Sequence, residues 1–452
     1  MECEYIMHKF FVTHLVYIVK FTLVVKIKLN IKSQKYNYYL IRKGKSMTNE
    51  WKIILVGDVV FQEDLKKSFL TEEMKKIVRD HDISSCHFEA QLYPDKNLKM
   101  GGYLWLNHKS SNYPKEDKLA IRKAFSPFIY QHPKAAEWVK DAGFNVINLA
   151  SNHLYDYGQK ALEYTLDSFP AQVKVGAGRD FESAYKLKIV EVKGTKVGFL
   201  SYCESEFGAL VEENTKRGGF AWINHPSVND RIKDAKTKVD VLIIQAHAGP
   251  EKTYLPIYEW RKRYQEFIDL GADAVIAHHP HVPQGWELYN NKAIFYSIGN
   301  FFFDTENKEK YWNYGMAVSL TFTGNKFEKL EVIPTKRTDE GTGVCKEKSY
   351  LEHLDNLCGM LKPECYPKLA DELCLKLWKE QYSYIYAQTI NIFPCTGIWN
   401  ICWKICGKIL SKLDLVDKLS LLHNIRIESH LWTTKRALAL MEEKYLMDNK
   451  TP

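Results

Sequence analysis

Histidines gather in the short sequence His278-His279-Pro280-His281, directly after the apolar run of residues 274–277. That run is short enough for a buried strand, and Pro280 predicts an extended conformation for His279. Imidazoles at the carboxyl end of a buried strand lie where open α/β sheets bind their ligands. The spacing therefore indicates a metal or catalytic site, although loop histidines with ordinary hydrogen bonds explain this stretch equally well when it is considered alone.

Four other apolar runs, far apart in the chain, also end in a polar side chain. The expected strands cover residues 51–56, 83–88, 144–150 and 240–245. The polar residues at their ends are, in order, Asp58, Glu89, Asn152 and His247. Carboxylates can bridge two cations, and imidazoles supply neutral nitrogen for manganese, iron or zinc. Together with His279 and His281 the set predicts a dinuclear divalent site. The alternative is that these residues cap strands and bond to loops.

The elements that must position these side chains alternate between strands and helices. Helices are expected over residues 63–80, 135–142, 160–169 and 258–270, the second and fourth closed by Gly143 and Gly271. Further strands are expected over residues 187–192, 194–202, 293–297 and 315–322, the last returning along a sheet edge. Strands separated by helices of this length predict an α/β fold with a partly parallel core.

Charge and cysteine content exclude some classes of protein. The chain of 452 residues has a net charge of +8, but residues 1–46 hold nine basic and two acidic residues, which leaves about +1 on the rest. The body therefore has no charge signature of a nucleic-acid-binding surface, and no nucleic acid is expected as a partner. Ten cysteines are present without a CxxC pair, which argues against a zinc ribbon and favours a reducing compartment.

Residues 1–46 can be interpreted in more than one way. Their apolar run, residues 10–25, is shorter than the roughly 20 residues that a spanning helix needs, and Lys26-Ile27-Lys28 stands where a secretory signal needs small residues. The basic residues 42–45 back-translate into a purine-rich, ribosome-binding-like sequence, so Met47 is expected to be the true start of a cytoplasmic protein. The alternative is a weak membrane anchor and a membrane-associated protein.

Taken in order, the motifs resemble the CapA family, which is associated with capsule or poly-γ-glutamate biosynthesis and is similar to calcineurin-like metallophosphoesterases. The matching segments are Gly57-Asp58, Glu89, residues 151–158 (SNHLYDYG), His247, residues 278–287 (HHPHVPQGWE) and residues 296–304 (YSIGNFFFD). The resemblance implies a metallophosphatase-like layered sandwich with central mixed β-sheets flanked by helices over residues 47–340. A C-terminal helical domain is expected over residues 341–452.

The resemblance also implies roles for single residues around two divalent ions: manganese, iron or zinc, with magnesium as an alternative. The implied first-metal ligands are Asp58, the bridging Glu89 and His281. The implied second-metal ligands are Glu89, Asn152, His247 and His279. His153 matches a histidine that acts on the leaving group, and Asp156 is expected to orient it. Glu287, Ser297 and Asn300 match family positions that line the same face as the metal ligands, and they are expected to contact the substrate.

Two departures from the family pattern concern the first metal. Val60 stands where phosphoesterases usually carry a histidine, which leaves that metal one ligand short. His87 stands where the family usually has asparagine. Either His87 supplies the missing nitrogen or it hydrogen-bonds within its loop, and we favour the second interpretation.

The expected function is metal-dependent hydrolysis of a phosphoester, or of a bond in an acidic polymer, during capsule synthesis. The alternative is a non-catalytic binding or scaffold subunit that assembles with other capsule-synthesis proteins. Outside the resemblance, residues 351–384 and 416–447 are helical in pattern. The apolar stripe of residues 398–413 is expected to pack on a neighbouring helix, with a membrane surface as the alternative. His423 and His430 are expected at a helix surface.

Overall fold

A computed structural model describes residues 49–92, 129–206, 208–389 and 421–448. Contacts separate the unit Met1–Gly44 from the unit Lys45–Pro452, and all described residues belong to the second. The expected leader, the proposed start at Met47 and the apolar stripe of residues 398–413 lie outside the described residues.

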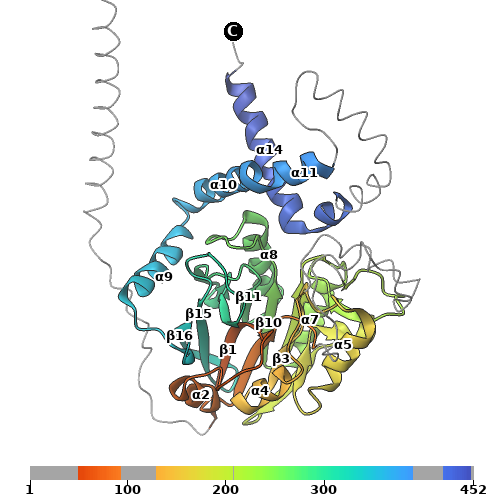
Figure 1. Ribbon diagram of the computed structural model, residues 1–452, viewed down its shortest axis with the longest axis vertical. Helices are drawn as coiled ribbons and strands as arrows, with labels where there is room; N and C mark the ends of the chain where they lie inside the picture. The colour runs from red at the N-terminus through yellow and green to blue at the C-terminus, as the bar shows by residue number, and fades with distance from the viewer. Residues whose placement is uncertain (1–48, 93–128, 207, 390–420, 449–452) are drawn as a thin grey trace, which may run out of the picture. The chain divides into compact units, whose positions relative to one another are not determined.

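The larger of the two main sheets has eight strands in the order β17-β16-β15-β1-β2-β3-β4, with β14 beside β1 (Figure 1). Strands β1 to β4 and β14 run parallel, while β15, β16 and β17 are antiparallel to their neighbours. The strands are β1 (Glu50–Val60), β2 (Ile83–Phe88), β3 (Val146–Asn148), β4 (Val173–Val175), β14 (Asn300–Phe303), β15 (Tyr314–Thr323), β16 (Lys326–Thr338) and β17 (Gly341–Val344).

The second main sheet has six strands in the order β12-β13-β11-β10-β7-β6, and its four central strands are parallel. Its strands are β6 (Lys188–Val192), β7 (Thr195–Cys203), β10 (Val241–His247), β11 (Ala274–His278), β12 (Trp286–Tyr289) and β13 (Lys292–Phe295). A small third sheet joins β5 (Ala177–Gly178), β9 (Gly219–Ala221) and β8 (Ala209–Leu210).

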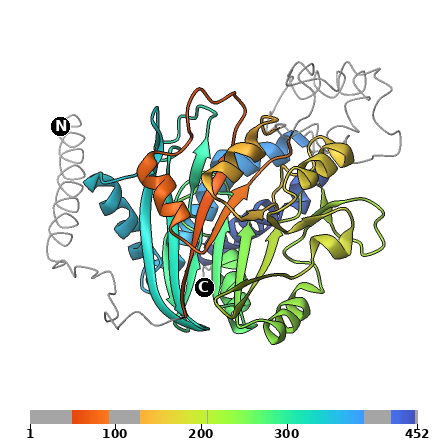
Figure 2. The same cartoon turned by 90° about the horizontal axis from the view of Figure 1, so that it is seen from below.

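The two main sheets pack face to face between layers of helices. In β1, Ile53 and Leu55 point into the core between the sheets, while Ile54 and Val56 point to the helical side, as the two-residue period of a strand requires. The larger sheet is covered by α2 (Glu72–Arg79), α4 (Ala135–Ala142) and α5 (Gly158–Asp167), which Figure 2 shows from below. The other sheet is covered by α7 (Val228–Lys238) and α8 (Tyr258–Asp269), and the short α6 (Phe181–Ala184) contacts β5 and β9 of the small third sheet.

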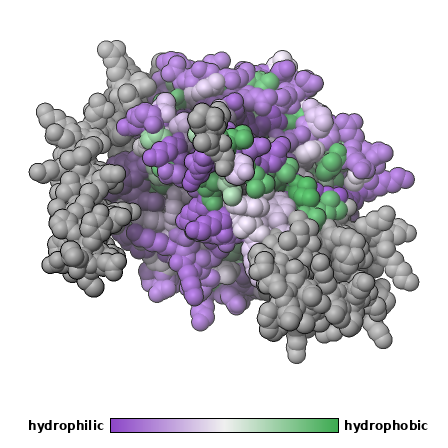
Figure 3. Space-filling model, turned by 90° about the horizontal axis from the view of Figure 1, so that it is seen from above, coloured by the Kyte–Doolittle hydropathy of each residue, from purple (hydrophilic) through white to green (hydrophobic). Residues whose placement is uncertain are grey.

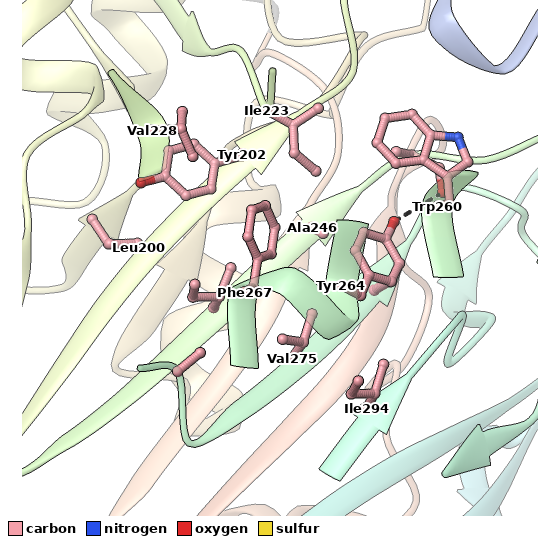
Figure 4. Close-up of a cluster of buried hydrophobic side chains, with 14 of the residues drawn as sticks. Leu200, Tyr202, Ile223, Val228, Ala246, Trp260, Tyr264, Phe267, Val275 and Ile294 are labelled. Atoms are coloured by element: carbon pink, nitrogen blue, oxygen red, sulfur yellow. Dashed lines mark hydrogen bonds between the residues drawn. The ribbon is translucent and has the colours of Figure 1, made fainter. Parts of the chain in front are cut away.

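Aromatic side chains fill the space under α8. Trp260, Tyr264 and Phe267 of this helix pack on Val275 and Ile294 of the six-stranded sheet (Figure 4). Because these rings are almost completely buried, they fix α8, and with it the loops at the carboxyl ends of β10 and β11.

The C-terminal helices share this core. They are α9 (Lys348–Met360), α10 (Tyr366–Leu377), the π-helical turn η3 (Trp378–Tyr382), α11 (Ser383–Thr389) and α14 (Glu428–Asp448). Tyr350 and Leu354 of α9 lie in the core between the sheets, and Ala437 of α14 belongs to the apolar cluster that contains Trp260 of α8 and Ala370 of α10. Figure 3 shows apolar patches among mostly hydrophilic residues on the face seen from above. The domain boundary at residue 340 stays a prediction, and β17, just beyond it, continues the large sheet.

The predicted fold class, α/β with mixed sheets flanked by helices and followed by further helices, is confirmed, but two elements differ from expectation. The helix expected over residues 63–80 begins only at Glu72, because Thr71 caps α2 by accepting from Met74 N and Leu70 pairs with Thr342. The strand near residues 315–322 is not at an edge, since β15 lies between β1 and β16.

The expected localisation is corrected. Among the described residues no helix is long and apolar enough to cross a lipid bilayer. The N-terminal segment, on which both the cytoplasmic and the membrane-associated alternatives depended, is outside those residues, so no apolar anchor is shown.

Candidate metal centre

Strand β1 carries Asp58 into the site past a local irregularity. The register with β2 shifts between Val56 and Asp58, and the same strand pairs with β14 directly beyond it. Gly57 allows this close approach, because a Cβ there would lie 1.9 Å from Gly299 O. Asp58 N donates to the same carbonyl at 3.2 Å, which holds the aspartate at the meeting point of the two strands.

Strand register explains why the other donors meet Asp58. His87 lies opposite Asp58 in the β1–β2 pair, and Glu89 follows two residues later on the same side of the chain. In the other sheet His247 lies opposite His278. Because these strands are parallel, their carboxyl ends come to one rim, where ligand sites in α/β folds form.

The first group of donors is Asp58, Glu89 and His281. His281 Nδ1 lies 3.2 Å from Asp58 Oδ2, and His281 Nε2 lies 3.5 Å from Glu89 Oε1. All three side chains are buried, and one ligand atom from each lies within 4.8 Å of the others. Neither carboxylate has a hydrogen-bond partner of good geometry among the described residues. Buried carboxylates without hydrogen-bond partners are expected to bind a cation.

The second group is Asn152, His247 and His279. His247 Nε2 lies 2.9 Å from Asn152 Oδ1 and 3.0 Å from His279 Nδ1. The Asn152 amide is oriented by its Nδ2, which donates to Glu206 Oε1 at 3.2 Å. An amide oxygen and two ring nitrogens therefore point at one small volume, as the ligands of a single ion do.

His87, which was expected to hydrogen-bond within its loop, does not. Both of its ring nitrogens lack a hydrogen-bond partner among the described residues, and its side chain is completely buried. The ring packs between His247 and His278, with centroids at 4.5 and 4.6 Å. One donor atom each from Asp58, His87 and His247 lies within 4.8 Å of the others, so His87 belongs to the cluster of possible ligands.

His278 is a further member that the sequence analysis did not assign. Its Nδ1 lies 3.3 Å from Asp58 Oδ1, opposite the oxygen that faces His281. The only available signal was its place at the end of β11, because the alternation of a strand says nothing about which neighbour a side chain will meet. Asp58 thus has histidines on both of its oxygens.

The turn that carries His279 and His281 is strained. Pro280 predicted an extended His279, but His279 has φ +94° and His281 has φ +59°. L-residues rarely adopt such angles, and they persist where the surrounding packing enforces them, often at functional sites. Here His281 faces the carboxylates of Asp58 and Glu89, and His279 faces His247 and Glu204.

Burial and charge set the protonation of the cluster. Burial lowers the pKa of His279 to about 4 and holds the pKa of His247 and His87 well below the ordinary value. Burial also raises the pKa of Glu89. Burial opposes protonation of His281 too, but the Glu89 and Asp58 carboxylates outweigh it and raise its pKa to about 10. Most of these imidazoles are therefore neutral, the form that binds metals.

His153 and Asp156 form the predicted pair beside the donors. His153 Nδ1 lies 2.8 Å from Asp156 Oδ2, which also accepts from Ile129 N at 2.9 Å. Both side chains are buried, and His153 directly follows the donor Asn152. Pairing at Nδ1 makes Nε2 the nitrogen of His153 that can exchange a proton with a bound substrate.

The three residues expected to line the face of the metal site, Glu287, Ser297 and Asn300, lie in different surroundings. Asn300 is at the cluster, with Oδ1 3.1 Å from His281 Nδ1. Ser297 Oγ donates to Val282 O at 2.8 Å and accepts from Gly299 N, which shapes the turn before β14. Glu287 on β12 pairs with Arg261 of α8 and accepts from Tyr296, and no contact with the histidines appears among the described residues.

One buried carboxylate next to the cluster was missed. Glu204, directly after β7, is fully buried, and its Oε1 lies 3.6 Å from His279 Nε2. Burial raises its pKa well above the ordinary value. His430, expected at a helix surface, is half-buried instead, with its ring 4.8 Å from Tyr382.

Comparisons with known proteins identify relatives of this chain. Two curated relatives are the capsule biosynthesis protein CapA of Bacillus anthracis, 27% identical over 296 residues, and the PGA biosynthesis protein CapA of Bacillus subtilis, 32% identical over 262 residues. The alignments cover 62% and 55% of this chain and 66% and 62% of the relatives, so the chain spans less than two thirds of their length.

Solved structures with similar folds include a putative 5′-nucleotidase of Staphylococcus aureus, with TM-score 0.39 and 16% identity over 68% of this chain and 58% of that one. A hypothetical protein of Thermus thermophilus has TM-score 0.40 and 12% identity over 63% of this chain and 99% of that one. At these scores the likeness carries no inference about a reaction. The family model for the bacterial capsule synthesis protein PGA_cap matches residues 52–305, more than half of the chain, and the chain belongs to that family.

Proposed function

We propose that this chain is a metal-dependent hydrolase of capsule synthesis that cleaves a phosphoester or a related bond in an acidic polymer. The observation that carries the proposal is the convergence of buried donors from both sheets, in which the oxygens of Asp58 and Glu89 and both ring nitrogens of His87 lack hydrogen-bond partners among the described residues. Such groups are costly to bury unless a ligand completes them. The names of the Bacillus relatives support the capsule and poly-γ-glutamate context.

The donor set fits two divalent cations. Carboxylate, amide and neutral imidazole ligands suit manganese, iron or zinc better than magnesium, which prefers an all-oxygen shell. Asp58, Glu89 and His281 would hold one ion, and Glu89 would be shared with the group of Asn152, His247 and His279. His87 is close enough to Asp58 to join the first group.

When bound, divalent ions supply hydroxide at neutral pH and stabilise the charge that develops on a phosphoryl group. The residues of the chain do the rest. The two sheets hold the donors rigidly at their rims, so the site needs little reorganisation when a substrate arrives. Asp156 orients the His153 ring, and His153 Nε2 would pass a proton to the departing oxygen, which is typically worth about 10²–10⁴ in rate.

Purified full-length protein tests this proposal directly. Elemental analysis after dialysis should find about two transition metals per chain. The loaded protein should hydrolyse a chromogenic phosphodiester, and the chelated protein should not. Metal content without turnover on phosphoesters or on poly-γ-glutamate would limit the proposal to binding.

A second function is a non-catalytic subunit that binds an acidic chain and assembles with other capsule-synthesis proteins. Val60 favours it, because this apolar side chain lies two residues beyond Asp58, packs against Phe303 and Trp312, and cannot bind a metal. Protein with fewer than one metal per chain, together with measurable affinity for poly-γ-glutamate, would favour this function over hydrolysis.

A further inference from the structure

The first turn of α14, which lies beyond the family match, reaches the loop that follows β7. Ser429 N donates to Glu204 Oε2, and Ser429 Oγ donates to Glu204 Oε1, both at 3.0 Å. The same hydroxyl accepts from Trp260 Nε1 at 2.8 Å. Ser429 is therefore fixed by α8 on one side and holds both oxygens of Glu204 on the other.

Glu204 also contacts both loops that carry the histidines of the second donor group. Its backbone N donates to His247 O at 3.0 Å, and its Oε1 accepts from Gly249 N at 2.9 Å. The same Oε1 lies 3.6 Å from His279 Nε2. Because Glu204 has no exposed surface, these contacts are made without competition from water.

The two nitrogens of His279 thus face different partners. Nδ1 lies 3.0 Å from His247 Nε2, inside the donor group, while Nε2 faces Glu204. A carboxylate beside one ring nitrogen keeps the proton there, leaves the lone pair on the other, and fixes the plane of the ring. Glu204 is placed to do this for His279.

We propose that Glu204 is a positioning residue for His279 and that Ser429 of the C-terminal helix holds it in place, so that α14 is a working part of the second metal site. The inference rests on the proposed function, because it assumes that the donor group binds a metal. It gives residues beyond the family match a role at the rim of the sheets. Metal binding and the docking of α14 are then coupled, and each strengthens the other.

Glu204→Gln provides the sharpest test, because an amide oxygen at the position of Oε1 can still accept from Ser429 Oγ and Gly249 N while the carboxylate beside His279 is lost. Titration of the chelated full-length protein with Mn²⁺ should show about 10–100-fold weaker binding at one of two sites. The metal-free protein should unfold at a slightly lower temperature, because Ser429 N loses its acceptor at Oε2 while the bonds to Oε1 remain. The visible spectrum of the Co²⁺-loaded protein should also change, because a loosened His279 alters the ligand field.

Glu428→Gln is the matched control. Like Glu204, Glu428 is a buried carboxylate, and it lies next to Ser429 at the start of α14. It accepts from Ser205 N, Trp222 Nε1 and Asn224 Nδ2 and does not face a donor histidine. Its replacement should leave Mn²⁺ affinity within about two-fold of wild type.

Variants of Ser429 distinguish a role in positioning Glu204 from a role in docking α14 alone. Ser429→Ala should weaken Mn²⁺ binding several-fold, and Ser429→Thr, which keeps the hydroxyl, should restore it. Arg436→Ala breaks an exposed ion pair between α14 and Asp371 and should leave the affinity unchanged.

The outcomes distinguish this inference from the function on which it rests. A wild-type chain that binds no Mn²⁺ or Co²⁺ overturns the metal site and the inference together. A wild-type chain that binds two ions, with Glu204→Gln binding them equally well, overturns the inference alone. Equal losses of Mn²⁺ affinity in Glu204→Gln and Glu428→Gln would show that α14 affects the metal site only by stabilising the fold. That result would also overturn the inference.

Discussion

His279 Nδ1 lies 3.0 Å from His247 Nε2, although the two residues are 32 positions apart in the sequence. His247 ends β10, and His279 follows β11, the next strand of the same sheet. The parallel register sets the separation of the two residues, and the positive φ of His279 turns its ring back toward β10.

Replacing His279 by Ala should abolish metal binding at the second donor group. The change removes one of the two imidazoles of this group and leaves Asn152, His247 and the shared Glu89, a set with a single nitrogen ligand for a transition metal. Mn²⁺ stoichiometry by calorimetry should fall from about two to about one. His81→Gln is the control, since His81 bonds Ile77 O and Ser319 Oγ away from the cluster. Unchanged stoichiometry in His279→Ala would contradict the assignment.

His87→Leu should have opposite effects with and without metal. In the metal-free protein the substitution removes buried nitrogens that have no hydrogen-bond partner among the described residues, so the free energy of unfolding should stay equal or rise by about 1 kcal/mol. In the Mn²⁺-loaded protein the stabilisation by metal should shrink. Urea unfolding with Mn²⁺ and with chelator measures both, and an undiminished metal effect would remove His87 from the ligand set.

His153→Asn should spare metal binding and lower turnover. His153 is paired with Asp156 and is not one of the converging donors, so its loss should leave Mn²⁺ affinity near wild type. Loss of the proton donor should lower kcat on a phosphodiester by about 10²–10⁴. The deficit should be smaller for a substrate whose leaving group needs no proton. Equal activity of variant and wild type would refute the role.

Stability at acid pH should depend on His430. Burial holds its pKa at about 4 in the folded chain, below the value of 6.5 expected when unfolded. Between these values the unfolded chain binds a proton that the folded chain does not, so stability falls as pH decreases through 6.5 and the loss is complete below about 4. At pH 5 the loss should be about 2 kcal/mol.

His430→Gln provides the comparison for that pH dependence. The free energy of unfolding of the chelated wild type should fall more between pH 7.5 and pH 5.0 than that of the variant, because only the wild type carries His430. The other histidines contribute equally to both proteins, so the variant should approach or exceed the wild type in stability at pH 5.0. A stability difference that is the same at both pH values would show that His430 does not resist protonation.

Glu287→Gln should affect stability and leave the metal site unchanged. Glu287 is half-buried and neutralises Arg261, which stacks on Tyr366 of α10. Leaving that guanidinium without its carboxylate should cost about 1–3 kcal/mol. Mn²⁺ affinity should match wild type. A raised KM for substrate with unchanged stability would instead support the role in substrate binding expected from the resemblance.

The sequence alone was enough to predict the strands and the donors at their ends. Short apolar runs followed by Asp58, Glu89, Asn152 and His247 indicated buried strands with polar ends, and this is a local pattern that strand periodicity reveals. Helix α4 ended at Gly143 as expected, because the left-handed conformation at φ +107° favours glycine. The family, and with it the expected ligand set, also came from these motifs and their order.

Only the tertiary structure decided which side chains meet. The placement of His87 and His278 against Asp58 depends on strand register across two sheets, and the partnership of Glu204 with Ser429 joins residues 225 positions apart. Patterns within a segment carry no information about such pairs, since they are fixed by packing between distant elements. The same reason applies to the strained turn at His279, where the fold overrides the local preference that Pro280 imposes.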